Sequence, residues 1–325
     1  MLYTGSFKDH RMITWLINDV CNFRCDYCHT WLSSKTQEPI KVSKLSGGLR
    51  TLGNDWVFLI SGGEPFLEPN FIEICQEITK NHFVALNTNL SLNNIYDFAD
   101  QVDPERTPFI NAAVHIIERE KTDKNLEAYI EKVHYLQERG FHTIAYYIVH
   151  PNLLHRMKSD IDSLKSRGIK KLRIKMFRGV YEGKYYPASF TEEQGEFIRT
   201  FDADWPELAL LDEIPSLKGK LCHAGGRFLF MTRNGDLRRC SGIFNKYGNL
   251  FENKVLFDDS PKPCPSSNCA ALYEGVRNST SETGKVSFID ALQLPKRNHQ
   301  LKSFVSSPGK LLKLKEKVIT RKALP

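Results

Sequence analysis

Residues 20–29 read VCNFRCDYCH and hold three cysteines, Cys21, Cys25 and Cys28, at the spacing C-x3-C-x2-C. They follow directly after the apolar run 13–17, which has the pattern of a buried strand. Thiolates are the ligands that hold iron–sulfur clusters, and a cubane cluster has four irons to ligate. Three closely spaced thiolates would therefore leave one iron open to a ligand that is not protein.

A structural zinc site is the main alternative for these cysteines. Zinc closes its shell with four ligands and usually takes cysteines in C-x2-C pairs. His29 is available as a fourth ligand, but it is adjacent to Cys28 and would strain a tetrahedron. Core cysteines without a role would fit poorly with the polar neighbours Asn22, Arg24 and Asp26. The residues alone favour a cluster.

A second motif lies at the end of the next expected strand. Residues 57–61 read VFLIS and run straight into Gly62, Gly63, Glu64 and Pro65. Two glycines allow the backbone to approach a ligand closely, and proline stiffens the exit from the turn. On its own, the tetrapeptide could be a plain turn between a strand and a helix.

Taken in order, the cysteine spacing, Tyr27 before the last cysteine and the glycine motif resemble the radical S-adenosylmethionine (SAM) superfamily. The resemblance implies that Cys21, Cys25 and Cys28 hold a [4Fe–4S] cluster whose fourth iron is chelated by SAM. An external one-electron donor, such as flavodoxin or ferredoxin, would then drive cleavage of SAM to methionine and a 5′-deoxyadenosyl radical. That radical would take a hydrogen atom from the substrate.

The same resemblance assigns candidate residues to the cofactor and the substrate. Tyr27 would lie near the adenine of SAM, and the methionine amino group would be lined by Gly62, Gly63, Glu64 and Pro65. The candidates for its ribose and carboxylate, all at later strand ends, are Asn87, Asn89 and His115. The residues that could face the substrate are His150, Arg173, Lys175 and Arg178. For each of these four, a salt-bridged or solvated residue at the rim is the alternative.

Strand and helix patterns alternate six times between residues 13 and 177. The expected strands are residues 13–19, 56–61, 82–86, 109–114, 143–149 and 171–177. Such alternation predicts right-handed βαβ units and a parallel sheet, which binds its ligands at the carboxyl ends of the strands. The resemblance implies a partial (β/α)6 TIM-like barrel, and six strands fit it. The fold class is therefore α/β.

Four more cysteines, Cys222, Cys240, Cys264 and Cys269, follow the barrel. Asn-Gly at 234–235, between two strand-like segments, is a strong hairpin signal. A hairpin would bring Cys222 and Cys240 together at one site. Four thiolates suffice for either a zinc ion or a cubane cluster, so the residues leave both open.

The spacing C-x12-G-x4-C, formed by Cys222, Gly235 and Cys240, is similar to the first half of the SPASM/Twitch extension of radical SAM enzymes. Four cysteines match the shorter Twitch form and imply one auxiliary [4Fe–4S] cluster. The interval from Cys264 to Cys269 departs from the usual spacing. Structural zinc remains the alternative for this set.

These expectations divide the chain into five parts. They are a lead-in (1–12), the barrel (13–185), a bridging segment (186–220), a Twitch-like auxiliary cluster domain with its hairpin (221–275) and a basic tail (276–325). The net charge of +7 comes from the end of the chain, because residues 296–325 carry nine Lys or Arg against one Glu. The rest is nearly neutral, which gives no electrostatic case for nucleic acid. The tail is a candidate for a short amphipathic helix that docks on its own domain.

Composition is ordinary for a globular protein, with 41% hydrophobic and 26% charged residues. No apolar run is long enough to span a membrane, and no signal peptide is evident, so we expect a cytoplasmic protein. In that compartment eight cysteines indicate metal ligands before disulfides. The exception is Cys75, which falls in an apolar helical row and is expected in the core.

The expected reaction is a two-electron oxidation of a small polar substrate, such as a sugar or aminocyclitol, with an auxiliary cluster accepting the second electron. The first alternative is a maturase that crosslinks or epimerises a ribosomal peptide. Many maturases carry a peptide-docking domain before the barrel, whereas about a dozen residues precede the first strand here. A non-catalytic zinc-binding interaction module is the alternative of another class, but it would leave residues 62–65 without a purpose.

Overall fold

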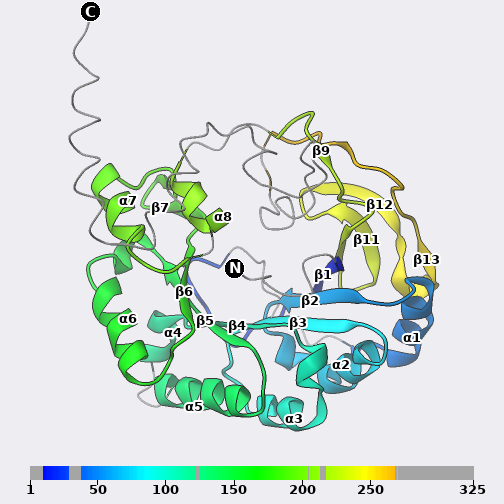
Figure 1. Cartoon of the computed structure of the whole chain (residues 1–325), viewed down its shortest axis with the longest axis horizontal. Helices are drawn as coiled ribbons and strands as arrows, with labels where there is room; N and C mark the ends of the chain where they lie inside the picture. Colours follow the sequence, from blue (N-terminus) through cyan, green and yellow to red (C-terminus); the bar gives the residue numbers. More distant parts are fainter. Residues whose placement is uncertain are drawn as a thin grey trace, which may run out of the picture.

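The computed structural model describes residues 10–28, 38–121, 125–203, 205–212, 217–267 and 269. Ten strands form one sheet in the order β13-β12-β11-β10-β1-β2-β3-β4-β5-β6, which curves so that helices cover its outer side (Figure 1). Neighbouring strands from β1 to β6 are parallel. These six are β1 (Arg11–Asn18), β2 (Trp56–Gly62), β3 (Phe83–Thr88), β4 (Ile110–Ala113), β5 (Thr143–Val149) and β6 (Leu172–Met176). The predicted α/β barrel is confirmed.

The helices between the strands bury their apolar residues at helical spacing. On α2, Phe71, Ile74, Cys75 and Ile78 are all buried, as a helix with one apolar face requires. The α-helices are α1 (Val42–Thr51), α2 (Phe71–Thr79), α3 (Asn94–Gln101), α4 (Ile116–Glu120), α5 (Asn125–Glu138), α6 (Met157–Ser166), α7 (Glu192–Ile198) and α8 (Trp205–Leu208). The short 3-10 helices are η2 (Pro65–Leu67), η3 (Pro104–Arg106), η4 (Pro151–Leu153), η5 (Ala209–Leu211) and η6 (Leu250–Glu252).

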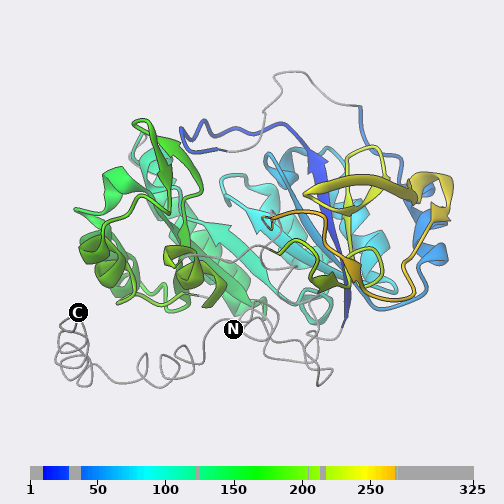
Figure 2. The same cartoon turned by 90° about the horizontal axis from the view of Figure 1, so that it is seen from above.

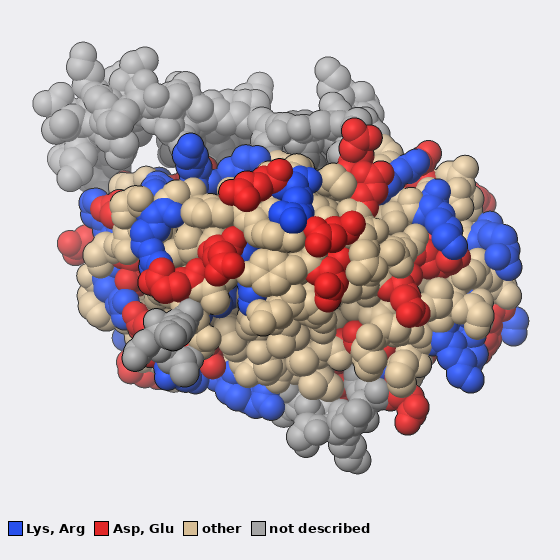
Figure 3. Space-filling model, turned by 90° about the horizontal axis from the view of Figure 1, so that it is seen from below, with Lys and Arg blue, Asp and Glu red and all other residues tan. Residues whose placement is uncertain are grey.

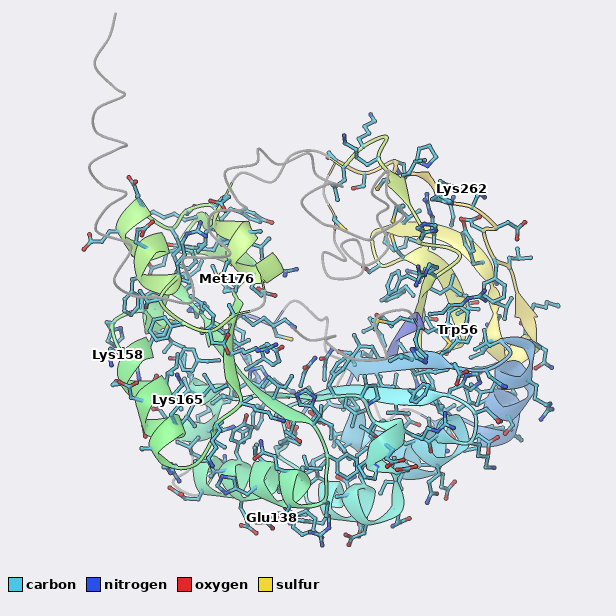
Figure 4. All side chains as sticks on the ribbon, viewed as in Figure 1. Trp56, Glu138, Lys158, Lys165, Met176 and Lys262 are labelled. Atoms are coloured by element: carbon cyan, nitrogen blue, oxygen red, sulfur yellow. The ribbon has the colours of Figure 1, made fainter. Side chains whose placement is uncertain are left out.

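The outer surface of the helical layer is charged and solvated. Basic and acidic side chains are interspersed over the face seen from below (Figure 3). The labelled Glu138, Lys158 and Lys165 lie on the outer helices, whereas Trp56 and Met176 mark strands β2 and β6 (Figure 4). In the described part of the chain, no helix has the length and apolar character needed to cross a membrane.

The two faces of the sheet pack against different apolar clusters. On β2, Phe58 and Ile60 pack with the helices in the main core, whereas Val57 and Leu59 face the inside of the barrel. A compact apolar cluster fills the inside near the amino ends of the strands, and we call it the inner plug. Its members are Met12, Val57, Leu59, Phe83, Ala85, Phe109, Ala224 and Phe228. Farther along the strands, polar side chains that include Asn87 and Asn111 also lie on the inner face.

The predicted hairpin forms, and it does more than the sequence indicated. Strands β10 (Phe228–Met231) and β11 (Asp236–Cys240) are antiparallel, and β10 also pairs in parallel with β1, Met12 opposite Phe228. The segment after the barrel therefore continues the barrel sheet. Three other strand pairs complete this part: β12 (Ile243–Asn249) with β13 (Lys254–Val255), β9 (Leu221–Cys222) with β14 (Lys262–Pro263), and β7 (Gly179–Tyr181) with β8 (Lys184–Tyr186). His29, residues 1–9 and the tail 276–325 lie outside the described residues.

A buried ion pair ties the hairpin turn to the barrel. Arg233 donates to the carboxylate of Glu68, whose side chain is 1% exposed, and to the Ile17 carbonyl oxygen at 2.7 Å. The Ile40 N–H also donates to Glu68, at 3.0 Å. Because Ile17 lies near the carboxyl end of β1, the pair fixes the turn beside the start of the cysteine loop.

We expect Arg233→Met to lower the free energy of unfolding by about 3–5 kcal/mol, because it leaves the Glu68 carboxylate buried without its cation. The double variant Arg233→Met/Glu68→Gln should recover part of the loss. Urea unfolding followed by circular dichroism measures both. As a control, Arg139→Met breaks an exposed pair with Asp100 and should leave the free energy of unfolding nearly unchanged. Equal losses in the two single variants would contradict the assigned role.

Candidate functional site

The cysteine loop leaves the end of β1 and crosses the carboxyl edge of the sheet, where it is drawn in dark blue (Figure 2). Its backbone turns at Cys25, whose carbonyl accepts from the Cys28 N–H at 3.1 Å. The Phe23 N–H donates to the Cys21 sulfur at 3.4 Å, a bond that stabilises a thiolate. The three thiols interact electrostatically with one another, so the loop gathers them in one place.

The glycine motif is packed directly against the backbone of this loop. Gly62 has a positive φ of 146°, and a Cβ on Gly63 would overlap the carbonyl oxygen of Val20. The Glu64 N–H donates to that same Val20 oxygen at 2.7 Å, and the Gly63 N–H donates to Asn18 at 3.1 Å. Only glycine allows this approach, so the motif holds the loop next to Cys21. Contact of these residues with methionine stays a prediction.

Glu64 links the ends of two strands with a buried carboxylate. It is 1% exposed and accepts hydrogen bonds from the Thr88 hydroxyl and the Asn89 N–H, both at 2.7 Å, and from the Phe66 N–H at 3.3 Å. Burial raises its pKa to about 7, against the lowering effect of these hydrogen bonds. Its side chain therefore fixes the position of Asn89.

Asn89 in turn supports the cysteine loop. Its side-chain NH2 donates to Asn22 at 3.2 Å and lies 3.8 Å from the Cys21 sulfur. Asn87, by contrast, lies within β3, because the strand extends two residues past its predicted end. It accepts a hydrogen bond from the Asn111 side chain at 2.7 Å on the inner face. Asn89 therefore contacts the cysteine loop, whereas Asn87 contacts the neighbouring strand inside the barrel.

The sequence did not single out Arg119 of α4, which is 2% exposed behind the cysteine loop. Its guanidinium donates to the carbonyls of Val114 and Asn89 at the ends of β4 and β3. It also stacks on the Phe23 ring, 5.4 Å from the ring centroid. Burial lowers its pKa only to about 10, so Arg119 is a fixed positive charge near the thiols.

Tyr27, His115 and His150 form an aromatic contact across the carboxyl edge. The Tyr27 hydroxyl lies 2.8 Å from His115 Nδ1, and the Tyr27 and His150 ring centroids are 5.5 Å apart. Burial, reinforced by Arg119, lowers the pKa of His115 to about 3, so the imidazole is neutral and shares a hydrogen bond with the Tyr27 hydroxyl. His150 is 1% exposed and packs on Phe177 as well. The structure brings these three predicted residues together.

The predicted basic residues separate into two settings. Arg173 and Lys175 lie on the inner face of β6, in register with Tyr146 and Ile148 of β5. The Lys175 ammonium lies over the Tyr146 ring, and Arg173 is 3.7 Å from the exposed Asp202. Arg178 pairs at 3.1 Å with the buried Glu207, so it also has a structural partner.

Asn111 is a further inner-face residue that the sequence did not single out. It is 8% exposed, and its side-chain oxygen is buried without a hydrogen-bond partner among the described residues. The signal was available, since Phe109 faces the inner plug and Asn111 follows it at the two-residue period of a strand. This oxygen is a buried acceptor on the inner wall of the barrel.

The second cysteine set lies at the opposite edge of the sheet. Cys222 and Cys240 both pack against the inner plug. Cys264 follows β14, and its N–H donates to the Lys220 carbonyl at 2.8 Å, which brings it beside β9. The thiols of Cys222, Cys240 and Cys264 interact electrostatically. Cys269 is half-buried, two residues past Ser267, whose carbonyl accepts from the Leu217 N–H.

In both cysteine sets, backbone N–H groups donate hydrogen bonds to cysteine sulfur atoms. The Ala224 N–H donates to Cys222 at 3.5 Å, and the Gly242 and Ile243 N–H groups donate to Cys240. Burial raises the pKa of Cys25 to about 12, so binding of iron there would release a proton. Within the described residues, no group of three or more His, Cys, Asp or Glu is arranged to hold one metal ion. The donor chemistry of both sets fits iron–sulfur ligation.

The raised pKa of Glu64 predicts a pH dependence of stability. In the unfolded chain the Glu64 carboxyl titrates near 4.5, whereas in the folded protein it stays protonated up to about pH 7. The protonated group stabilises the folded state, and this contribution is lost as the pH rises from about 4.5 to about 7. Glu64→Gln should remove this loss, so the variant and the wild type should diverge as the pH rises from about 4.5 to about 7. Urea unfolding at both pH values tests this, and parallel changes would contradict it.

Comparison with known proteins bears on the barrel. Residues 15–175 match a family model described as the Radical SAM superfamily. A GTP 3′,8-cyclase of Haemophilus ducreyi is 34% identical over 85 residues, covering 22% of this chain and 24% of that protein. A 7-carboxy-7-deazaguanine synthase of Thermoplasma acidophilum is 30% identical over 87 residues, covering 26% of this chain and 41% of that protein. The chain therefore matches less than half the length of these curated relatives.

Two solved structures share the fold over most of the chain. Native anSMEcpe with bound AdoMet aligns with a TM-score of 0.54 and 14% identity, covering 74% of this chain and 78% of that one. Streptococcus suis SuiB bound to S-adenosylmethionine aligns with a TM-score of 0.52 and 14% identity, covering 84% of this chain and 67% of that one. The motifs, the barrel and the family match agree. The chain contains a radical SAM superfamily domain, which residues 15–175 form.

Proposed function

We propose that this radical SAM enzyme carries two iron–sulfur clusters, one at each end of its barrel. The supporting observation is the strand register. Extending the β10–β11 register, which pairs Phe230 with Arg238, puts Cys240 beside Phe228, opposite Met12 at the start of β1. The cysteine loop begins after Asn18 at the other end of that strand. Six residues of strand correspond to about 20 Å between the two levels.

At the carboxyl edge, Cys21, Cys25 and Cys28 would hold a [4Fe–4S] cluster with SAM on its fourth iron. With an electron from a donor such as flavodoxin or ferredoxin, this cofactor pair would supply the radical chemistry that removes a hydrogen atom from the substrate. The chain contributes the packing of the loop on Gly63 and the neutral imidazole of His115 beside Tyr27. These groups keep the edge dry and hold the cofactor in place.

At the amino edge, Cys222, Cys240, Cys264 and Cys269 would hold a second [4Fe–4S] cluster in a Twitch-like arrangement. A cluster there would lie below the inner plug, with the barrel interior between it and SAM. Such an acceptor would take the second electron from a substrate radical, so the reaction would be a net two-electron oxidation. A zinc ion at the same cysteines could not accept that electron.

Polar side chains on the inner wall support the proposal of a small polar substrate. Asn87 and Asn111 lie one strand layer above the inner plug, and Lys175 and Arg173 project from β6 on the same face. Hydrogen-bonding groups on the inner wall fit a hydroxylated molecule, such as a sugar or aminocyclitol. The buried oxygen of Asn111 would accept from a hydroxyl or amine of that molecule.

A ribosomal peptide-modifying maturase is the second candidate, and the structural neighbours favour it. The same two neighbours have also been solved as anSMEcpe with a bound Kp18Cys peptide and SuiB bound to the precursor peptide SuiA. Deuterium transfer into 5′-deoxyadenosine separates the two candidates. Transfer from labelled polyols or amino sugars supports the small substrate, and transfer only from labelled peptides supports the maturase.

The activity is tested by forming 5′-deoxyadenosine from SAM under strict anaerobiosis with a chemical reductant. Wild-type protein reconstituted with iron and sulfide should produce it, and Cys25→Ala should lose at least about 100-fold in rate, because one iron would lose its thiolate. Cys75→Ala is the matched control, since Cys75 is buried in α2 and away from both edges. Retained activity in Cys25→Ala would exclude the proposed site.

A further inference from the structure

Arg239 is a buried arginine at the second cysteine set. It lies on β11 directly before Cys240 and is 6% exposed, although an arginine stays charged in proteins. Its guanidinium donates hydrogen bonds to backbone carbonyl oxygens. The acceptors are Ala224 at 3.0 Å, Pro263 at 3.1 Å, Lys262 at 2.8 Å and Cys222 at 3.4 Å.

These carbonyls connect the segments that carry the cysteines. Two belong to the stretch that includes Cys222, and two belong to β14, directly before Cys264. The third segment is β11 itself, which carries Cys240. One guanidinium therefore holds three cysteine-bearing segments in a fixed relation. A planar fork with donors in several directions can do this, whereas the single ammonium of lysine cannot span the same acceptors.

The charge of Arg239 is not matched by a salt bridge. Among the described residues, no carboxylate lies within ion-pair distance of its guanidinium. The nearby Asp258 interacts electrostatically with Arg239, but its carboxylate accepts from Tyr247 at 2.7 Å and forms its ion pair with Lys262. Burying a charge is costly unless an opposite charge compensates it, and carbonyl dipoles do so only in part. A cubane with four thiolates is an anion, and it would supply the missing charge.

We propose that Arg239 is the positioning residue of the second cluster, assembling its cysteine site and supplying its counter-charge. The inference rests on the proposed function, which places a cluster at these cysteines. It adds a residue outside the ligand set whose loss empties one site and spares the other. Cys21, Cys25 and Cys28 lie at the far edge of the barrel, so their cluster reports whether a variant is still folded.

The first test counts iron and acid-labile sulfide per chain after anaerobic reconstitution. Wild type should hold about eight irons and Arg239→Met about four, and SAM should change the signal of the remaining cluster as it does in wild type. Arg238→Met is the matched control, because Arg238 is the preceding residue on β11 and stacks on the exposed Phe244. It should keep about eight. Eight irons in Arg239→Met would overturn the assembly role.

The second test separates charge from scaffolding with Arg239→Gln, which keeps hydrogen-bond donors and removes the charge. If this variant holds only about four irons, the assembly role is supported. If it holds eight, the reduction potential of the second cluster should be lower than in wild type, since a nearby cation favours the reduced cluster. An unchanged potential in fully loaded Arg239→Gln would overturn the counter-charge role.

The failure of the proposed function would look different. A wild type with about four irons, all lost in Cys25→Ala, and one zinc would exclude the second cluster and this inference with it. A wild type with eight irons whose count does not respond to Arg239→Met would reject the inference alone.

Discussion

The pairing of β1 on both sides is the constraint on which the rest of the structure depends. Strand β2 pairs with one edge of β1 and β10 with the other, although β10 is more than 200 residues away in sequence. The cysteine loop leaves one end of β1, and the second cysteine set lies beside its other end. One strand thus sets the separation of the two sites, and the inner plug fills the space next to the second.

Each cysteine set is backed by a buried arginine. Arg119 binds the carbonyls at the ends of β3 and β4 behind the loop, and Arg239 binds those of the segments around Cys222 and Cys264. In both places the guanidinium fixes backbone by hydrogen bonds and leaves a positive charge near thiols. Positive charge favours thiolates, so the same residue that orders each site also suits it to bind iron.

Local sequence could predict the parts of the fold that depend on short-range patterns. Strand and helix positions follow from apolar periodicity, and the Asn-Gly hairpin follows from turn chemistry. The pairing of β10 with β1 could not be predicted, because nothing in a four-residue strand specifies a partner so distant in the chain. Strand β3 runs two residues past its predicted end, because the polar Asn87 and Thr88 continue it. Asn87 lies on the inner face, whereas Thr88 lies on the opposite face and donates to Glu64.

The site residues also divide into those with a local sequence signal and those without one. The cysteine spacing and the glycine motif indicated the carboxyl edge, and the contact of Gly63 with Val20 explains why their order matters. Arg119 and Arg239 escaped notice because a lone arginine has no sequence signal that it is buried. Asn111 could have been found by extending the two-residue period from Phe109. The position of the two cysteine sets at opposite ends of the barrel follows only from the strand register.

The central claim is that two clusters lie at opposite ends of one strand. Pulsed electron paramagnetic resonance on the reduced, anaerobically reconstituted protein measures the distance between two paramagnetic clusters directly. We expect a single distance of about 20 Å, the length of strand between Met12 and Asn18. A spectrum with one paramagnetic cluster, or a distance below about 10 Å, would contradict the account.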